Sequence, residues 1–216
     1  MSGLIGILFD LDGTLVNTLA DIAGVVNLVR QQYGLKRLTT EVVKGYIGHG
    51  VDHLIKHSFQ DLSTFDPTSL HKQVMDTYLA NPHLGGHVYP GVKEMLAKLR
   101  ANPHLKLAIA TNKPTDAAFK TLAYYLPETL FEVVAGPEKV SEKKPSPIHL
   151  LEVIERLNLT PQDAVYVGDD PVDAQCAQAA GVSFYAAGWG YGGVKVTKER
   201  YLARPDELLA KLTFKH

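Results

Sequence analysis

The stretch LIGILFDLDGTL, residues 4–15, decides which fold class this chain can adopt. It opens with a run of apolar residues and glycine that lacks the alternation of polar and apolar positions. Such a run is typical of a strand covered on both faces, as in a parallel sheet flanked by helices. Asp10 and Asp12 follow where this strand would end, and ligands bind at the carboxyl ends of strands in such sheets. The stretch therefore predicts a buried first strand that ends at a polar site.

Length and composition limit the kinds of protein this chain can be. It has 216 residues, of which 45% are hydrophobic, so it can build a sizeable core. The net charge is −1 and no run of lysines and arginines occurs, so we expect no nucleic-acid or anionic-membrane partner. Cys176 is the single cysteine, and the apolar run 4–9 is too short for a signal peptide or a membrane span. We therefore expect a cytoplasmic protein, monomeric or homodimeric, that acts on a small molecule.

Further apolar runs along the chain predict the rest of the sheet. They occupy residues 105–110, 131–134, 164–167 and 182–186. Between them lie segments with apolar residues at helical spacing, such as Val92, Met95, Leu96 and Leu99, or Ile148, Leu151, Val153, Ile154 and Leu157. Strands that alternate with helices predict an α/β fold with a doubly wound, Rossmann-like parallel sheet.

One connection is much longer than a strand–helix–strand unit requires, which is about 30 residues in all. The first strand ends near residue 9 and the second begins near residue 105, while the helix at 91–101 suffices for the crossover. The surplus residues carry helical patterns at 18–33, 39–46, 51–59 and 67–80. We therefore predict an α/β core domain over residues 1–16 and 85–216, and a small all-helical domain inserted over residues 17–84.

The motif that begins at Asp10 carries the first chemical prediction. Two carboxylates spaced by one residue on extended backbone point the same way, and Gly13 lets the chain turn after them. One carboxylate, Asp10, can attack phosphorus and form an aspartyl-phosphate, while Asp12 protonates the leaving oxygen and then activates water. The alternative is a turn with aspartates that cap a helix. The buried strand before the motif and the Gly-Thr after it favour the catalytic interpretation.

Polar residues also follow the strand at 105–110 and precede a later helix. Thr111 and Asn112 come before Pro114, which suits the first turn of a helix whose free N–H groups could bind phosphate. Lys144 could neutralise charge on the nucleophile and the phosphoryl group, and we choose it over Lys143 because Pro145 fixes the backbone after it. An ordinary helix cap and a solvated lysine pair are the alternatives.

The stretch GDDPVD, residues 168–173, follows the run at 164–167 and predicts a cation site. Mg²⁺ is usually held by one or two carboxylates, with waters and substrate phosphate as further ligands. Asp169 and Asp173 fit that role, although Mn²⁺ would bind the same oxygens. Asp170, directly before Pro171, has the place of a helix N-cap. All three acids could instead only complement a helix N-terminus.

These motifs, in this order, resemble those of the haloacid dehalogenase superfamily, and they span nearly the whole chain. The resemblance implies that Asp10 is the nucleophile and Asp12 the general acid and base. It implies that Mg²⁺ is held by the Asp10 carboxylate, the Asp12 backbone carbonyl and Asp169, with Asp173 beside it. It further implies that Thr111 and Asn112 bind phosphate and that Lys144 balances charge.

The chemistry within this superfamily can be narrowed. A halide leaves without a proton, so the second acid, Asp12, indicates phosphoryl transfer rather than dehalogenation. Phosphonate hydrolysis would require a lysine from the inserted domain, and Lys44 and Lys56 lie in no recognisable motif. The remaining expectation is a Mg²⁺-dependent phosphatase that hydrolyses a small phosphorylated metabolite. A sugar-phosphate mutase or pyrophosphatase is the alternative enzyme, and a catalytically silent binding module is the alternative of another class.

The inserted segment contains a loop similar to the cap loop of phosphoglycolate phosphatases. In it, Gly48 and Gly50 would let the backbone approach a ligand, and His49 could touch the ligand's distal end. The alternative is a turn between helices with an exposed histidine. The chain departs from the family pattern at Asn17, where an acid is frequent, and at Asp170, where serine is usual.

The glycines of GWGYGG, residues 188–193, match the spacing of a dinucleotide-binding loop. They follow the last predicted strand, however, and no further strand–helix–strand unit comes after them. We therefore interpret this stretch as a surface loop.

Overall fold

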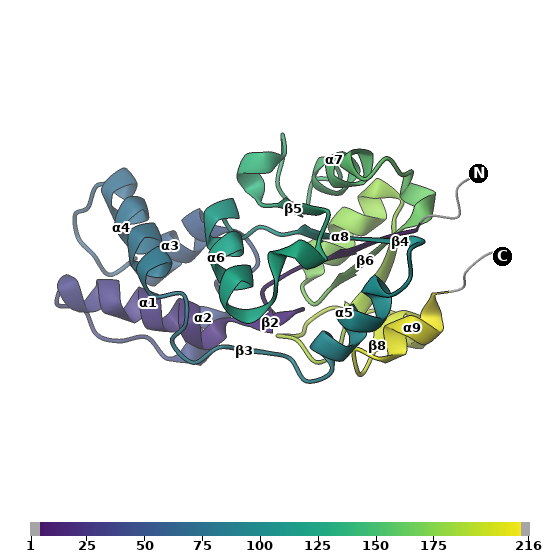
Figure 1. Cartoon of the computed structure of the whole chain (residues 1–216). Coiled ribbons are helices and arrows are strands. Elements are labelled where there is room, and N and C mark those ends of the chain that lie inside the picture. The colour runs from purple at the N-terminus through teal and green to yellow at the C-terminus, as the bar shows by residue number, and fades with distance from the viewer. Residues whose placement is uncertain (1–4, 213–216) are drawn as a thin grey trace.

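The computed structural model describes residues 5–212 and centres on a parallel six-stranded sheet. Its strand order is β5-β4-β1-β6-β7-β8, and every neighbouring pair runs parallel (Figure 1). The strands are β1 (Ile5–Phe9), β4 (Leu105–Ala110), β5 (Val133–Ala135), β6 (Ala164–Gly168), β7 (Ser183–Ala187) and β8 (Tyr201–Leu202). The first strand lies at the centre because its apolar run can be buried on both faces. The predicted α/β fold is confirmed.

Helices cover both faces of the sheet. Side chains of β1 alternate between two cores: Ile7 and Phe9 belong to one, and Leu8 to the other. The first core is closed by α5 (Val92–Arg100), α6 (Thr115–Tyr125) and α9 (Glu207–Lys211). The second is closed by α7 (Ile148–Arg156) and α8 (Pro171–Ala180). Short 3-10 turns lie at Glu128–Leu130, Pro137–Lys139, Pro161–Asp163 and Lys198–Arg200.

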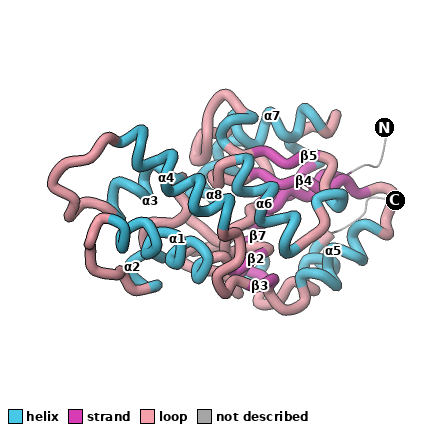
Figure 2. The backbone as a smooth tube through the Cα atoms, turned by 60° about the vertical axis from the view of Figure 1, so that its left-hand side comes forward, coloured by secondary structure: helices cyan, strands magenta, loops and turns pink. Residues whose placement is uncertain are grey.

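A group of helices, called the helical insert below, separates β1 from β4. It comprises α1 (Leu19–Gln32), α2 (Thr40–Lys44), α3 (Val51–Ser58) and α4 (Pro67–Ala80). The antiparallel strands β2 (Val16–Asn17) and β3 (His87–Val88) pair where the chain enters and leaves it. The insert has its own apolar core, to which α6 contributes Ala117, and it lies to one side of the sheet (Figure 2). That residues 17–84 form a separate domain stays a prediction.

Several element boundaries differ from those predicted. Leu4 lies outside the described residues, and the strand predicted at 131–134 is β5, Val133–Ala135. Phe131 ends a 3-10 turn instead, because its N–H group donates to Glu128 O. Strands β2, β3 and β8 were not predicted, since two residues are too few to show a pattern. Every helix in the described part of the chain is too short or too polar to cross a bilayer.

Candidate active site

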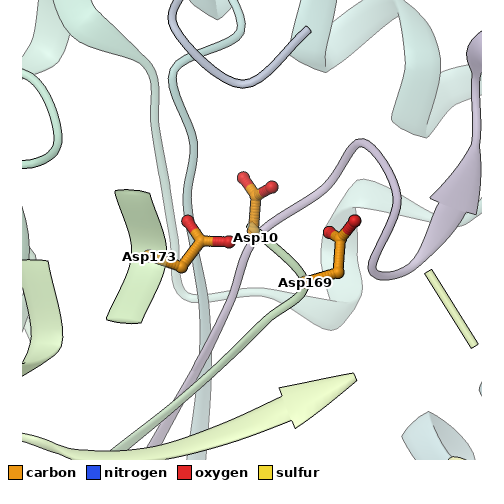
Figure 3. Close-up of side chains that lie close together, drawn as sticks. All are labelled: Asp10, Asp169 and Asp173. Atoms are coloured by element: carbon orange, nitrogen blue, oxygen red, sulfur yellow. The ribbon is translucent and has the colours of Figure 1, made fainter. Parts of the chain in front are cut away.

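Side chains from widely separated motifs meet at the carboxyl end of the parallel sheet. Asp10 follows β1, Asp169 follows β6, and Asp173 lies in the first turn of α8. Figure 3 shows these three carboxyl groups close together, and one oxygen from each lies within 4.8 Å of the others. Each of these aspartates is buried. The convergence follows from parallel strand order, which brings all strand ends to one edge.

Lys144 lies inside this cluster of carboxylates. Its Nζ donates to Asp10 Oδ1 at 3.0 Å and to Asp173 Oδ1 at 2.7 Å, and only 3% of the residue is exposed. Burial alone would lower the pKa of Lys144, but Asp10 and Asp173 raise it above its usual range. The Lys144 side chain is therefore positively charged beside Asp10. Its sequence neighbour Lys143, in contrast, is exposed, and its Nζ donates to His49 O.

Tyr166 supports Lys144 from the middle of β6, and sequence reasoning missed it. The Tyr166 hydroxyl accepts from Lys144 Nζ at 2.8 Å and lies 2.9 Å from Asp173 Oδ1 and 2.8 Å from Ala110 O. A tyrosine within an otherwise apolar strand was the available signal, because a buried hydroxyl needs hydrogen-bond partners. Tyr166 thus holds both charged groups in place.

The carboxylates carry more negative charge than Lys144 can balance. Burial raises the pKa of Asp10 to about 7; Lys144 opposes this rise, while Asp173 and Asp12 add to it. Burial, with Asp10 and Asp173 nearby, also raises the pKa of Asp169 well above its usual range. Buried carboxylates that repel one another need a cation, and oxygen ligands suit Mg²⁺. The residues present therefore fit a divalent metal ion.

Asp169 is held by groups from two other loops. Thr14 Oγ1 donates to Asp169 Oδ1 at 2.7 Å, and the Tyr191 N–H group donates to Oδ2 at 2.8 Å. Gly13 has φ of +87°, and a Cβ atom there would lie 2.3 Å from Asp169 Oδ2. Position 13 therefore requires glycine for both its backbone angle and the space that Asp169 occupies.

The loop 188–193 reaches the site, so its interpretation as a plain surface loop was incomplete. A Cβ atom on Gly190 would lie 2.3 Å from Gly13 O, which shows how closely the two loops approach. The Tyr191 hydroxyl accepts from Thr18 N at 3.0 Å, and Trp189 Nε1 donates to Thr14 O at 2.9 Å. Gly190 thus permits close backbone contact, and Trp189 and Tyr191 on either side of it brace the segment that follows β1.

Asp12 has a different environment from Asp10. Lys113 Nζ donates to both Asp12 oxygens, at 2.9 and 3.1 Å, and Thr18 Oγ1 donates to Oδ1 at 2.6 Å. Burial alone would lower the pKa of Lys113, but the Asp12 carboxylate raises it above its usual range. The sequence analysis assigned Lys113 no role. No local pattern could have paired it with a residue 101 positions away.

Thr111 and Asn112 lie at the end of β4, beside Lys144. Asn112 Nδ2 donates to Lys144 O at 3.0 Å and to Gly48 O at 2.9 Å, while its Oδ1 accepts from Lys144 N. Thr111 Oγ1 accepts from Lys113 N. The start of the helix differs from the one predicted: α6 starts at Thr115 with Pro114 as its N-cap residue, and the Glu138 side chain accepts from Thr115 N at 2.9 Å. Asp170, in contrast, caps α8 through Val172 N, as predicted.

The predicted ligand loop of the helical insert faces the site in part. Gly48 O contacts Asn112, and a Cβ atom on Gly48 would lie 2.6 Å from Asp170 Oδ2. Gly48 and Gly50 line the cavity described next, whereas the exposed His49 ring stacks on His53 with centroids 4.8 Å apart. The structure therefore places the loop backbone, and not the His49 ring, at the site.

A cavity of about 810 Å³, open to solvent, extends from Asp10 into the helical insert. Asp12, Thr111 and Lys144 line its floor, together with other residues of the motifs. Its opposite wall is mostly apolar; the residues that line it include Tyr46, Tyr78, Ile22, Val25, Val26, Val51, Leu54, Val74 and Met75. The strand-end carboxylates thus open onto a cavity that has a polar floor and a largely apolar opposite wall.

Comparison with known proteins places the chain in one class of enzyme. A family model described as haloacid dehalogenase-like hydrolase matches residues 7–187, and the chain belongs to this family. It is an enzyme of the phosphatase class within that superfamily. The parallel sheet with its covering helices is thereby accounted for as the fold of a hydrolase.

Among the individual proteins to which the chain is similar, several are phosphoglycolate phosphatases. The chain is 36% identical to the phosphoglycolate phosphatase of Aliivibrio fischeri over 192 residues, which cover 86% of this chain and 84% of the relative. It is 34% identical to the phosphoglycolate phosphatase of Nitrosospira multiformis, covering 86% of this chain and 83% of the relative. A crystal structure described as a predicted phosphoglycolate phosphatase from Haemophilus somnus superposes with a TM-score of 0.88 and 27% identity, covering 97% and 98% of the two chains.

Proposed function

We propose that this phosphatase is Mg²⁺-dependent and hydrolyses a small, phosphoglycolate-like phosphate monoester through an aspartyl-phosphate on Asp10. The observation that carries the proposal is the contact of Lys144 with Asp10 at the floor of the cavity that extends into the helical insert. A carboxylate held at a strand end by a buried cation is suited to attack phosphorus while charge builds up beside it. The likeness to phosphoglycolate phosphatases supports the choice of substrate.

The proposed reaction has two steps. An Asp10 carboxylate oxygen forms a bond to phosphorus as the ester P–O bond breaks, and protonated Asp12 gives its proton to the leaving oxygen. Water then attacks the phosphorus, Asp12 accepts a proton from it, and the Asp10–phosphorus bond breaks to release inorganic phosphate. Thr111 and Asn112 would contact the phosphoryl oxygens, and Lys144 would balance their charge.

The Asp10 carboxylate, the Asp12 backbone carbonyl and Asp169 would hold the Mg²⁺ ion. When bound, the ion would neutralise charge on the phosphoryl group and on the surrounding carboxylates. Asp173 would lie beside the ion, and its oxygens already contact Lys144, Tyr166 and the Asp170 N–H group. We therefore assign Asp173 chiefly to the positioning of Lys144.

The helical insert would act as a cap over this site. Its apolar wall would exclude bulk water around the ester, and Gly48 and Gly50 would bring the loop backbone close to the substrate. A cap of this kind favours a small metabolite over a phosphoprotein. Residues 17–84 as the cap, a cytoplasmic location and a monomeric or homodimeric state remain predictions.

Phosphate release from phosphoglycolate tests the proposal, with and without Mg²⁺. Asp10→Asn should lower kcat at least a thousandfold, because an amide is no nucleophile towards phosphorus. The control is Asp116→Asn, which changes an exposed aspartate on α6 and should keep activity. Full activity of Asp10→Asn, or no phosphate release by the unaltered protein with Mg²⁺, would contradict the proposal.

A further inference from the structure

Lys113 is a cation that lies between Asp12, the acid of the proposed reaction, and the helical insert. Its Nζ contacts the Asp12 carboxylate and lies 4.4 Å from the ring centroid of Tyr78 on α4. The residue is only 7% exposed. We propose that Lys113 Nζ binds a carboxylate of the leaving group and so selects phosphate monoesters that carry one; this rests on the proposed function.

The charges around the cavity support this assignment. Among the described residues that line it, the lysines are Lys113 and Lys144, and arginine is absent. Lys144 lies against Asp10 and Asp173, at the phosphoryl end of the site. Lys113 is therefore the cation on the side where the leaving group would lie.

The apolar wall strengthens the argument. A carboxylate enclosed without a partner is strongly destabilised, whereas one that meets an ammonium group is compensated. The insert presents Val26, Val74 and Met75 to the cavity, and none of these can satisfy a charge. A carboxylate on the leaving group would therefore find its charge partner at Lys113 and not in these apolar side chains.

The chemistry of the leaving group fits the position of Lys113. In phosphoglycolate a single carbon separates the ester oxygen from the carboxyl group. Asp12 must lie within hydrogen-bond distance of that ester oxygen to protonate it, and Lys113 touches both Asp12 oxygens. A carboxyl group one carbon away is then within reach of the same ammonium group.

The experiment compares two esters that differ in this carboxylate. Phosphate release with Mg²⁺ is measured for phosphoglycolate and for ethyl phosphate, in the unaltered enzyme and in Lys113→Met, Lys113→Arg and Lys120→Met. Lys120→Met is the matched control, because Lys120 is exposed on the neighbouring helix α6. In Lys113→Met, kcat/KM for phosphoglycolate relative to ethyl phosphate should fall about tenfold to a hundredfold, largely through KM. Lys113→Arg should keep part of this preference, and Lys120→Met all of it.

The outcomes separate the inference from the function on which it rests. Equal losses on both esters in Lys113→Met, or no preference for phosphoglycolate in the unaltered enzyme, would overturn the role of Lys113 and leave the phosphatase proposal intact. No phosphate release from either ester by the unaltered enzyme would overturn both. If Lys113→Met does not fold by circular dichroism, Lys113→Arg decides: a preference lowered through KM for phosphoglycolate supports the inference, and equal changes on both esters refute it.

Discussion

The ammonium group of Lys144 bridges Asp10 and Asp173, at 3.0 Å from Oδ1 of the first and 2.7 Å from Oδ1 of the second. This one buried cation joins the strand end of β1 to the start of α8. Stability and catalysis therefore depend on the same residue, because removal of Lys144 leaves the buried Asp10 and Asp173 carboxylates without this cationic partner.

We predict that Lys144→Met lowers kcat about a hundredfold to a thousandfold, since charge on the phosphoryl group loses its balance. The free energy of unfolding should fall by about 3–5 kcal/mol, as for other broken buried ion pairs. Urea unfolding and steady-state kinetics measure the two effects. Lys143→Met, at the exposed neighbouring position, should change both kcat and the free energy of unfolding only slightly. Comparable losses in both variants would show that Lys144 has no special role.

Tyr166→Phe tests how much the hydrogen bond from Lys144 to Tyr166 contributes, because the variant keeps the charge of Lys144. The substitution removes the hydroxyl that contacts Lys144 and Asp173 and leaves the ring in place. We expect a loss of about 1–3 kcal/mol in unfolding free energy, and a kcat reduced about tenfold, because the ammonium group is held less firmly. Tyr124→Phe, on the exposed face of α6, is the control. A kcat equal to that of the unaltered enzyme would show that Tyr166 is only a core residue.

Stability should depend on pH through Asp10. Burial, opposed by Lys144, raises the folded-state pKa of Asp10 to about 7 from its ordinary 3.8, so the folded protein binds more protons than the unfolded chain between these values. The contribution of Asp10 to stability is therefore present below about pH 4 and is lost as the pH rises to about 7. In EDTA, unfolding free energy of the unaltered protein relative to Asp10→Asn should fall across this window, by at most about 1.4 kcal/mol per pH unit. Parallel pH curves for the two proteins would contradict the shift.

Mg²⁺ should stabilise the folded protein, because the ion binds the folded carboxylate cluster and not the unfolded chain. Thermal unfolding with increasing Mg²⁺ should show a rising Tm in the unaltered protein. The rise should be much smaller in Asp169→Asn, which lacks one charged ligand, and unchanged in Asp116→Asn. A parallel titration with Mn²⁺ compares the two ions. An equal rise in Asp169→Asn would exclude Asp169 from the metal site.

Gly13→Ala should lower the free energy of unfolding by far more than the left-handed backbone angle at position 13 explains. Gly34 is a matched control, since its φ is +67° and a Cβ atom there would meet nothing within 4 Å. Gly34→Ala should lower the unfolding free energy by about 1–2 kcal/mol, the usual cost of a left-handed residue. Gly13→Ala should cost more and also weaken Mg²⁺ binding, because the new Cβ atom displaces Asp169. Equal losses at the two positions would show that the space beside Asp169 is not required.

Local sequence predicted the elements that local physics controls. The apolar run of β1, the run of β4 at Leu105–Ala110 and the helix α4 at Pro67–Ala80 appear where they were expected. Asp170 caps α8 because a carboxylate before Pro171 reaches the first free N–H groups. In each case the residue and its partners are close in the chain, so the pattern contains the information.

The contacts of Lys113 and Tyr166 could not be predicted in this way. Lys113 meets Asp12 across 101 positions, and Tyr166 meets Lys144 across 22. The Tyr191 N–H group reaches Asp169 because the loop after β7 folds back over the end of β6. Such pairs depend on strand order and loop course, neither of which leaves a periodic pattern in the sequence.

The order of residues along the chain therefore determined which strands are buried, where the polar motifs follow them, and that an all-helical segment interrupts the sheet. Only the tertiary structure decided which charges face one another: Lys144 between Asp10 and Asp173, Lys113 on Asp12, and the His49 ring turned towards His53. The physical reason is that hydrophobic periodicity acts within one element, whereas ion pairs form between elements whose separation is set by packing of the whole sheet.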